Sequence, residues 1–315
     1  MSSVSNQNMR TSLNERDGFQ VWWRLLRPHT LTAAFVPVFV GTMLAALDHG
    51  IHLGLFAAML FASILIQAAT NMFNEYYDFV RGLDNEKSVG IGGTIVRDGI
   101  QPRTVLTLAI SFLAVATLLG VYICASSSWW VAVIGLVSML LGYLYSGGPY
   151  PIAYTPLGEL AAGLFMGTII VAISYYIQSL SISWEVIVIS VPIAIFIGAI
   201  NLSNNIRDRV GDAENGRKTL AILFGHHGAV RFLLSLYVVA YGLTLMLIAL
   251  GMLPIWSLLT LLSIRKGTQS IQGFAGEKSP LEMMPAMKAT AQTNTFYGML
   301  LGISLLLQLL IPFSF

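Results

Sequence analysis

Apolar residues along this chain gather in long runs that are separated by short polar stretches. Nine runs stand out, at residues 31–47, 53–69, 105–125, 129–145, 160–177, 186–200, 232–252, 253–264 and 296–311. A helix needs about 20 residues to cross the hydrocarbon core of a bilayer, and most of these runs reach that length when their polar ends are included. The eighth run is the shortest, because Arg265 follows it at once, and it predicts a helix that is short, tilted or extended past its basic end. The pattern predicts nine membrane-spanning helices around a central cavity.

The composition agrees with this pattern. Hydrophobic residues make up 56% of the chain and charged residues only 10%. A chain so poor in charge cannot cover its surface with polar groups, so we expect an all-α integral membrane protein whose solvent is largely the lipid bilayer, with no nucleic-acid partner. The single cysteine, Cys124, excludes an intrachain disulfide and is expected to be a buried apolar side chain.

The chain begins with a polar segment. Residues 1–18 are rich in Ser and Asn and predict a disordered tail, which precedes a single domain over residues 19–315. No secretory signal peptide is visible, because several Arg residues precede the first apolar run. The stretch QVWWRLLRPHT combines aromatic and basic side chains, which is typical of a short helix that lies against lipid headgroups: Trp22, Trp23, Arg24 and Arg27. We interpret it as an anchor without a chemical role.

The basic residues indicate the orientation in the cell membrane. With nine spans and a cytoplasmic N-terminus, the tail and the connections after the second, fourth, sixth and eighth spans lie in the cytoplasm, and the C-terminus lies outside. All 17 Lys and Arg residues fall in four of these five regions. The positive-inside rule favours this topology. We therefore expect the active site to open to the cytoplasmic side, where the connections are longest.

Two polar motifs follow the second and sixth apolar runs. The pattern Asn-x-x-Asn-x-x-x-Asp occurs in the stretch NMFNEYYDFVRGLD and again in NLSNNIRDRVGD, first as Asn71, Asn74 and Asp78 and then as Asn201, Asn204 and Asp208. The repetition suggests two related helical halves, roughly residues 31–155 and 156–315. Acids at a single helix end are often only soluble caps, but two matching motifs favour a functional site.

The motifs have the chemistry of a metal site. Residues four apart share a helix face, so Asn74 lies beside Asp78, and Asp208 lies beside Asp212. Asp84 would face elsewhere on a continuous helix, and we expect Gly82 to end the helix and let the loop turn Asp84 back. Converging carboxylates need neutralising cations, and oxygen ligands without clustered His or Cys indicate Mg²⁺, which commonly bridges to phosphate.

Basic and aromatic residues accompany the acids. Candidates for holding phosphate share the acidic loops: Arg81, Lys87, Arg97, Arg207, Arg217 and Lys218. Positive-inside topology alone explains most of these charges. Tyr76, Tyr77, Tyr143 and Tyr145 could shield a carbocation, although interfacial aromatic belts are an equally good explanation. The five His residues have no ligand spacing and are expected at the interface. Acids, bases and a lipid-facing cavity together suit a diphosphate that carries a long hydrocarbon tail.

The sequence resembles the UbiA superfamily of intramembrane prenyltransferases over nearly its whole length. NEYYDFVRGLD at 74–84 is similar to the family's first Asp-rich motif, and NNIRDRVGDAENGRKTLAILFG at 204–225 is similar to its second. The resemblance implies Mg²⁺, with two ions bridging the diphosphate, and metal ligands at Asn74, Asp78, Asp84, Asp208 and Asp212, with Asn204 as a companion. We expect catalytic roles for Asp78, Asp208 and Asp212. From the charges and aromatic rings of the motifs and loops, we also expect substrate contacts by Asn74, Arg81, Lys87, Arg97, Arg207, Lys218, Tyr76 and Tyr145.

Within the superfamily, the resemblance is strongest to the branch that prenylates 1,4-dihydroxy-2-naphthoate. The stretches WWRLLRPHTLTAAFVPVFVGT, YSGGPYPIAYTPLGE and NNIRD carry it. Glu75 stands where hydroxybenzoate prenyltransferases usually have Asp, and the spacing from Asp78 to Asp84 is longer than theirs. The expected substrates are therefore polyprenyl diphosphate and dihydroxynaphthoate, and the expected product is demethylmenaquinone. A prenyltransferase for hydroxybenzoate, homogentisate or haem is an alternative, and a secondary transporter is an alternative of another class.

Overall fold

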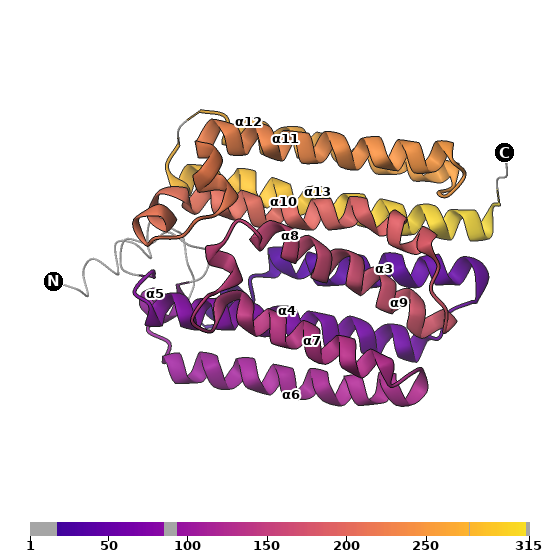
Figure 1. Cartoon of the computed structure of the whole chain (residues 1–315), viewed down its shortest axis with the longest axis horizontal. Coiled ribbons are helices and arrows are strands. Elements are labelled where there is room, and N and C mark those ends of the chain that lie inside the picture. Colours follow the sequence, from indigo (N-terminus) through magenta and orange to yellow (C-terminus); the bar gives the residue numbers. More distant parts are fainter. Residues whose placement is uncertain (1–17, 85–92, 277, 313–315) are drawn as a thin grey trace.

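The computed structural model describes residues 18–84, 93–276 and 278–312, and every regular element in this part of the chain is helical. The predicted tail at residues 1–17 and Lys87 lie outside the described residues. Long helices lie side by side in a bundle (Figure 1). The elements are α2 (Phe19–Leu26), α3 (Pro28–Asp48), α4 (Leu53–Val80), α5 (Thr94–Asp98), α6 (Pro102–Ser126), α7 (Trp130–Ser146), η1 (Ile152–Tyr154), α8 (Gly158–Ala162), η2 (Gly163–Ile169), α9 (Ile170–Ser179), α10 (Trp184–Glu214), α11 (Leu220–Ala249), η3 (Ile255–Ser263), α12 (Ile264–Phe274) and α13 (Pro280–Leu310).

Seven helical segments in the described chain are long and apolar enough to cross a membrane, so this is a multi-pass membrane protein. They are α3, α4, α6, the continuous segment α8–η2–α9, α10, α11 and α13. The predicted run at 129–145 is the shorter apolar helix α7. The run at 253–264 forms the short 3₁₀ helix η3, and the helical chain continues past its basic end as α12, which is one of the outcomes expected for this run.

The acidic motifs lie on helices that continue beyond their apolar runs. The run at 53–69 is the first part of α4, which ends only at Val80, and the run at 186–200 is part of α10, which ends at Glu214. Both helices lead to the same end of the bundle. Figure 1 shows α5 and the connection between α10 and α11 at the left end, whereas the connection between α3 and α4 lies at the right. The topology therefore brings the two motifs together.

Small residues let the helices approach closely. Gly163 and Gly167 of η2, spaced as in a GxxxG pattern, face Ala194 of α10, and a Cβ added at Gly167 would lie 2.5 Å from the Ala194 Cα. Such close backbone approach fixes α10 against the preceding helix. His226 is buried, and its Nε2 lies 2.9 Å from the carbonyl oxygen of Phe274, so this side chain links α11 to the end of α12.

Candidate active site

A cavity of about 510 Å³ lies within the bundle and reaches both motifs. Its polar lining includes Asn74, Asp78 and Asp84 from the first motif and Asn204 and Asp208 from the second. The guanidinium-bearing residues Arg27, Arg207 and Arg217 line it as well. The rest of the wall is largely apolar and extends to residues at the opposite end of α6 and α7, among them Cys124 and Trp129. The cavity therefore joins a charged mouth to a hydrophobic interior.

The first motif is completed by a turn at the end of α4. Gly82 has φ +74°, a left-handed conformation that suits glycine, and it follows the last helical residues. The backbone N–H groups of Leu83 and Asp84 then donate to the carbonyl oxygen of Asp78 at 2.9 and 3.2 Å. Asp84 thereby returns to the cavity that Asp78 lines, as the sequence predicted.

The second motif lies on α10, where Arg207 holds Asp208. The Nε and Nη2 atoms of Arg207 donate to Oδ1 and Oδ2 of Asp208 at 2.7 and 2.5 Å, a two-pronged pair. The third nitrogen, Nη1, lies 3.1 Å from the sulfur of Met287 on α13. The Arg207 side chain is only 7% exposed. The charged side chain of Arg207 is thus held at the mouth of the cavity by the Asp208 carboxylate and by the Met287 sulfur.

Arg217 links the two motifs. It follows α10, and its guanidinium donates from Nη2 to Asp78 Oδ1 at 2.7 Å and pairs through Nη1 with Asp212 Oδ1 at 3.0 Å. The same guanidinium lies 4.8 Å from the centre of the Tyr154 ring. Burial alone would lower the pKa of Arg217, but the carboxylates of Asp78 and Asp212 raise it above its ordinary value, so the side chain stays charged. One cation therefore neutralises an acid from each motif.

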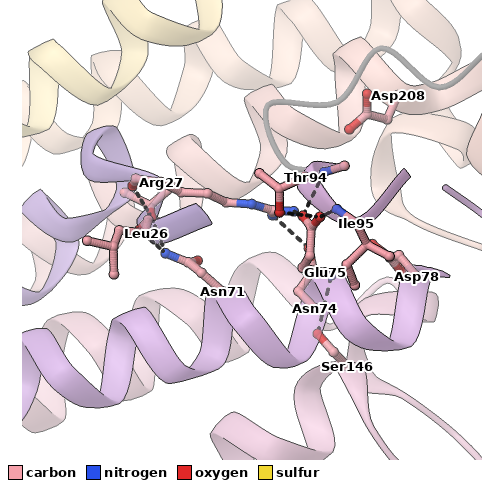
Figure 2. A network of polar contacts seen from close by, with 12 residues as sticks. Leu26, Arg27, Asn71, Asn74, Glu75, Asp78, Thr94, Ile95, Ser146 and Asp208 are labelled. Carbon is pink, nitrogen blue, oxygen red and sulfur yellow. Dashed lines mark hydrogen bonds and ion pairs between the residues drawn. The ribbon is translucent and has the colours of Figure 1, made fainter. Parts of the chain in front are cut away.

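Glu75 has a structural role that the sequence did not reveal. Its carboxylate is buried, with 1% of the residue exposed, and it accepts hydrogen bonds from Gly93 N at 2.7 Å, Thr94 Oγ1 at 3.0 Å and Ile95 N at 3.1 Å. These donors belong to the start of α5, which Figure 2 shows against Glu75. The start of α5 is thus tied to the first motif.

Arg27 is the main site residue that the sequence interpretation missed. Its Nη1 donates to Asn74 Oδ1 at 2.7 Å, and its Nη2 lies 3.7 Å from Glu75 Oε2 (Figure 2). Arg27 has φ 50° and ψ 62°, which is uncommon for a residue with a side chain, and it joins α2 to α3 just before Pro28. The view of QVWWRLLRPHT as an anchor without chemistry is wrong for this residue. The aromatic residues Trp22 and Trp23 are exposed, as that view expects.

Of the other candidate substrate-binding residues, some line the cavity and others lie away from it. Arg81 donates to the carbonyl oxygens of Ser146 and Gly148 at 2.6 and 2.8 Å, so it fixes the loop after α7. Tyr145 lines the cavity and donates its hydroxyl to Asn201 Oδ1 at 2.9 Å. Three further candidates do not line the cavity: Tyr76, which packs in an apolar cluster, Arg97, which lies on α5, and Lys218, which is exposed.

The oxygen atoms at the mouth suit a divalent ion whose remaining ligands come from the substrate. Among the described residues, no three His, Cys, Asp or Glu side chains form a ready-made metal cluster. Each motif instead offers a few carboxylate and amide oxygens. In the second motif, Asn204 Oδ1 and Asp212 Oδ2 are buried without a hydrogen-bond partner. Mg²⁺ is usually held by one or two carboxylates together with substrate phosphates, so a divided donor set fits this ion. Asp212 faces Arg217 rather than the cavity.

Fold and site together define a helical membrane protein whose cavity joins a charged mouth to an apolar interior. The model of the UbiA prenyltransferase family matches residues 34–269, and the chain belongs to this family. It is therefore an intramembrane prenyltransferase. It is 54% identical over 308 residues to the 1,4-dihydroxy-2-naphthoate octaprenyltransferase of Bacillus subtilis (strain 168). This alignment covers 98% of this chain and 99% of that protein.

Solved structures agree in fold. The apo structure of a UbiA homologue from Aeropyrum pernix K1 superimposes with a TM-score of 0.67 at 14% identity, over 88% of this chain and 97% of the other. A UbiA homologue from Archaeoglobus fulgidus, bound to DMAPP and Mg²⁺, gives a TM-score of 0.63 at 18% identity, over 89% and 98%. At these identities the comparison establishes the fold.

Proposed function

We propose that this enzyme transfers a polyprenyl group from polyprenyl diphosphate to 1,4-dihydroxy-2-naphthoate. The products are diphosphate, CO₂ and demethylmenaquinone in its quinol form. The observation that carries the proposal is the single cavity that joins both acidic motifs to an apolar channel. Along α4 the lining runs from Asp78 to Met59, roughly 28 Å for a helix that rises about 1.5 Å per residue. The B. subtilis relative, which is named for this acceptor, supports the same assignment.

The acids and amides of the two motifs are the proposed ligands of Mg²⁺. Asn74, Asp78 and Asp84 would act from one side of the mouth and Asp208 from the other, while Asp212 would act with Arg217. Bound Mg²⁺ supplies positive charge that stabilises the departing diphosphate. Two ions bridging the diphosphate would match the two-sided donor set. The Mg²⁺-bound homologue from A. fulgidus is consistent with this assignment.

The arginines and the apolar wall complete the chemistry. Arg27, Arg207 and Arg217 line the mouth and provide donors for phosphate oxygens, so that the electron pair of the breaking C–O bond passes to a stabilised diphosphate. The ring carbon that bears the carboxylate then attacks the allylic cation, and the bond from this carbon to the carboxylate breaks, which releases CO₂ and returns the electron pair to the aromatic ring. The apolar lining excludes water, which would convert the cation to an alcohol. Tyr145 is the cavity-lining tyrosine suited to face the cation.

The proposed topology has nine spans, with the motifs on the cytoplasmic side and the C-terminus outside. Seven segments meet the length and hydropathy of a span, and α7 together with the η3–α12 segment would supply the other two. The clustering of basic residues supports this orientation. The wall of the tail channel includes Val121 and Leu136, which are also exposed on the outside of the bundle, so a long tail would have access to lipid.

Product identification tests this function. Purified enzyme is given Mg²⁺, a polyprenyl diphosphate and either dihydroxynaphthoate or hydroxybenzoate, and the products are identified by mass. We expect the prenylated, decarboxylated naphthalene product with diphosphate release. Formation of the benzoate adduct alone would contradict the acceptor but retain the prenyltransferase. Flux of substrate into proteoliposomes without any prenylated product would favour a transporter.

A further inference from the structure

The cavity wall between α3 and α4 carries a small polar network below Asn74. Asn71 donates from Nδ2 to the carbonyl oxygen of Leu26 and to Thr30 Oγ1, both at 2.9 Å. Gln67 donates from Nε2 to Asn71 Oδ1 at 3.3 Å and to Thr30 Oγ1 at 3.4 Å. All three side chains are buried and line the cavity. On α4, Asn71 lies slightly less than one helical turn deeper than Asn74, the nearest proposed diphosphate ligand, and Gln67 lies about two turns deeper.

The direction of every hydrogen bond in this network follows from one backbone group. The carbonyl oxygen of Leu26 only accepts, so Asn71 must present its NH₂ there (Figure 2) and turn Oδ1 toward Gln67. Gln67 must therefore present its own NH₂ to Asn71. Thr30 donates its hydroxyl hydrogen to the carbonyl oxygen of Arg27 at 2.9 Å, so it accepts from both amides.

The one open polar atom that results is the side-chain oxygen of Gln67. Both Nε2 hydrogens are used, whereas Oε1 makes no hydrogen bond with any described residue and belongs to a side chain that lines the cavity. Oε1 is therefore an unpaired acceptor that stays accessible from the cavity, where a ligand can reach it. Neither end of the prenyl donor can satisfy it, because phosphate oxygens are themselves acceptors and a hydrocarbon tail has no polar hydrogen.

We propose that Gln67 Oε1 accepts the hydrogen bond of a ring hydroxyl of the aromatic acceptor, and that the Thr30–Gln67–Asn71 wall is the acceptor subsite. The inference rests on the proposed function and names the residue that positions its second substrate. A hydrogen bond accepted from the hydroxyl increases the electron density of the ring and thereby its reactivity toward the allylic cation.

The test compares Gln67→Met, which retains side-chain length but removes the acceptor, with Gln272→Met, the same exchange at an exposed position of α12. Each purified enzyme is assayed with dihydroxynaphthoate and with its two mono-methyl ethers. For Gln67→Met we expect kcat/KM for the acceptor to fall by about 3- to 10-fold, as for one neutral hydrogen bond. The KM for polyprenyl diphosphate should be unchanged. Gln272→Met should match the wild type.

The methyl ethers separate a direct contact from a structural effect. If Gln67 binds the hydroxyl, blocking that hydroxyl should abolish the difference between wild type and Gln67→Met. A loss that is the same with all three acceptors, a rise in the KM for polyprenyl diphosphate, or an unchanged acceptor kcat/KM would each overturn the subsite. Failure of the wild type to form any prenylated naphthalene would instead refute the proposed function, and the two results are distinguishable.

Discussion

The substitution Arg217→Gln removes the positive charge that pairs with both acidic motifs. The Arg217 guanidinium contacts Asp78 at 2.7 Å and Asp212 at 3.0 Å, and the side chains of the three residues are 11%, 15% and 10% exposed. Two unit charges about 4 Å apart interact by about 4 kcal/mol at an effective dielectric constant of about 20. Desolvation offsets part of this, but removing one partner of a buried pair typically costs about 3–5 kcal/mol because the other charge stays buried. We expect a loss of stability of that order without Mg²⁺.

Thermal unfolding in detergent, with and without Mg²⁺, measures this effect. Arg217→Gln should unfold several degrees below the wild type in EDTA, and Mg²⁺ should restore more stability to the variant than to the wild type, because the ion replaces the missing positive charge. Arg217→Lys, which retains the charge, is the matched control and should lose less. An Arg217→Gln variant as stable as the wild type, or one that Mg²⁺ does not restore, would refute the view that these acids form one cation-dependent site.

Three further changes test other parts of the structure. Glu75→Gln should leave a donor at the start of α5 unpaired, at a cost of about 1–3 kcal/mol, and should speed hydrogen exchange at 93–98; unchanged exchange would contradict this role. Gly167→Leu should destabilise the protein by more than about 3 kcal/mol, because its side chain would clash with the Ala194 backbone; a normal unfolding temperature would argue against this packing. Gly120→Trp places a large side chain in open space beside the channel, so it should reduce kcat/KM for long polyprenyl diphosphates more than for short ones; equal losses would exclude Gly120 from the tail path.

Much of the fold was predictable because a membrane-spanning helix requires a long run of apolar residues, which is visible in the sequence. All nine runs correspond to apolar helical segments, but the run at 253–264 differs from the others in its type of helix. Its backbone is 3₁₀ rather than α, with Ser257, Thr260 and Ser263 at every third position of the buried side. Helix ends were less predictable, because α4 and α10 continue as polar helices after their hydrophobicity ends, and hydropathy cannot detect that continuation.

The part of the candidate site formed by the repeated Asn and Asp motifs was predictable from the sequence. The part that depends on tertiary contacts was not. Spacing placed Asn74 beside Asp78, and the glycine at 82 correctly indicated that Asp84 would return to the cavity. Nothing local distinguishes Arg27, which lines the cavity, from Arg81, which holds a loop, because both lie next to apolar helices. Their roles depend on partners far away in the sequence. The metal and substrate roles of these residues, and the division into two related halves, stay predictions.

The central claim is that the two acidic motifs act together on one Mg²⁺–diphosphate group. Its most direct test is the rate of Mg²⁺-dependent diphosphate release in the presence of dihydroxynaphthoate for wild type, Asp78→Asn, Asp208→Asn and the double variant. Each single change should lower the rate by at least about 100-fold, as for the loss of one transition-state contact. The double variant should lose little more, since residues that act as a unit are not additive. A single variant with a rate near that of the wild type, or losses that multiply in the double variant, would contradict the claim.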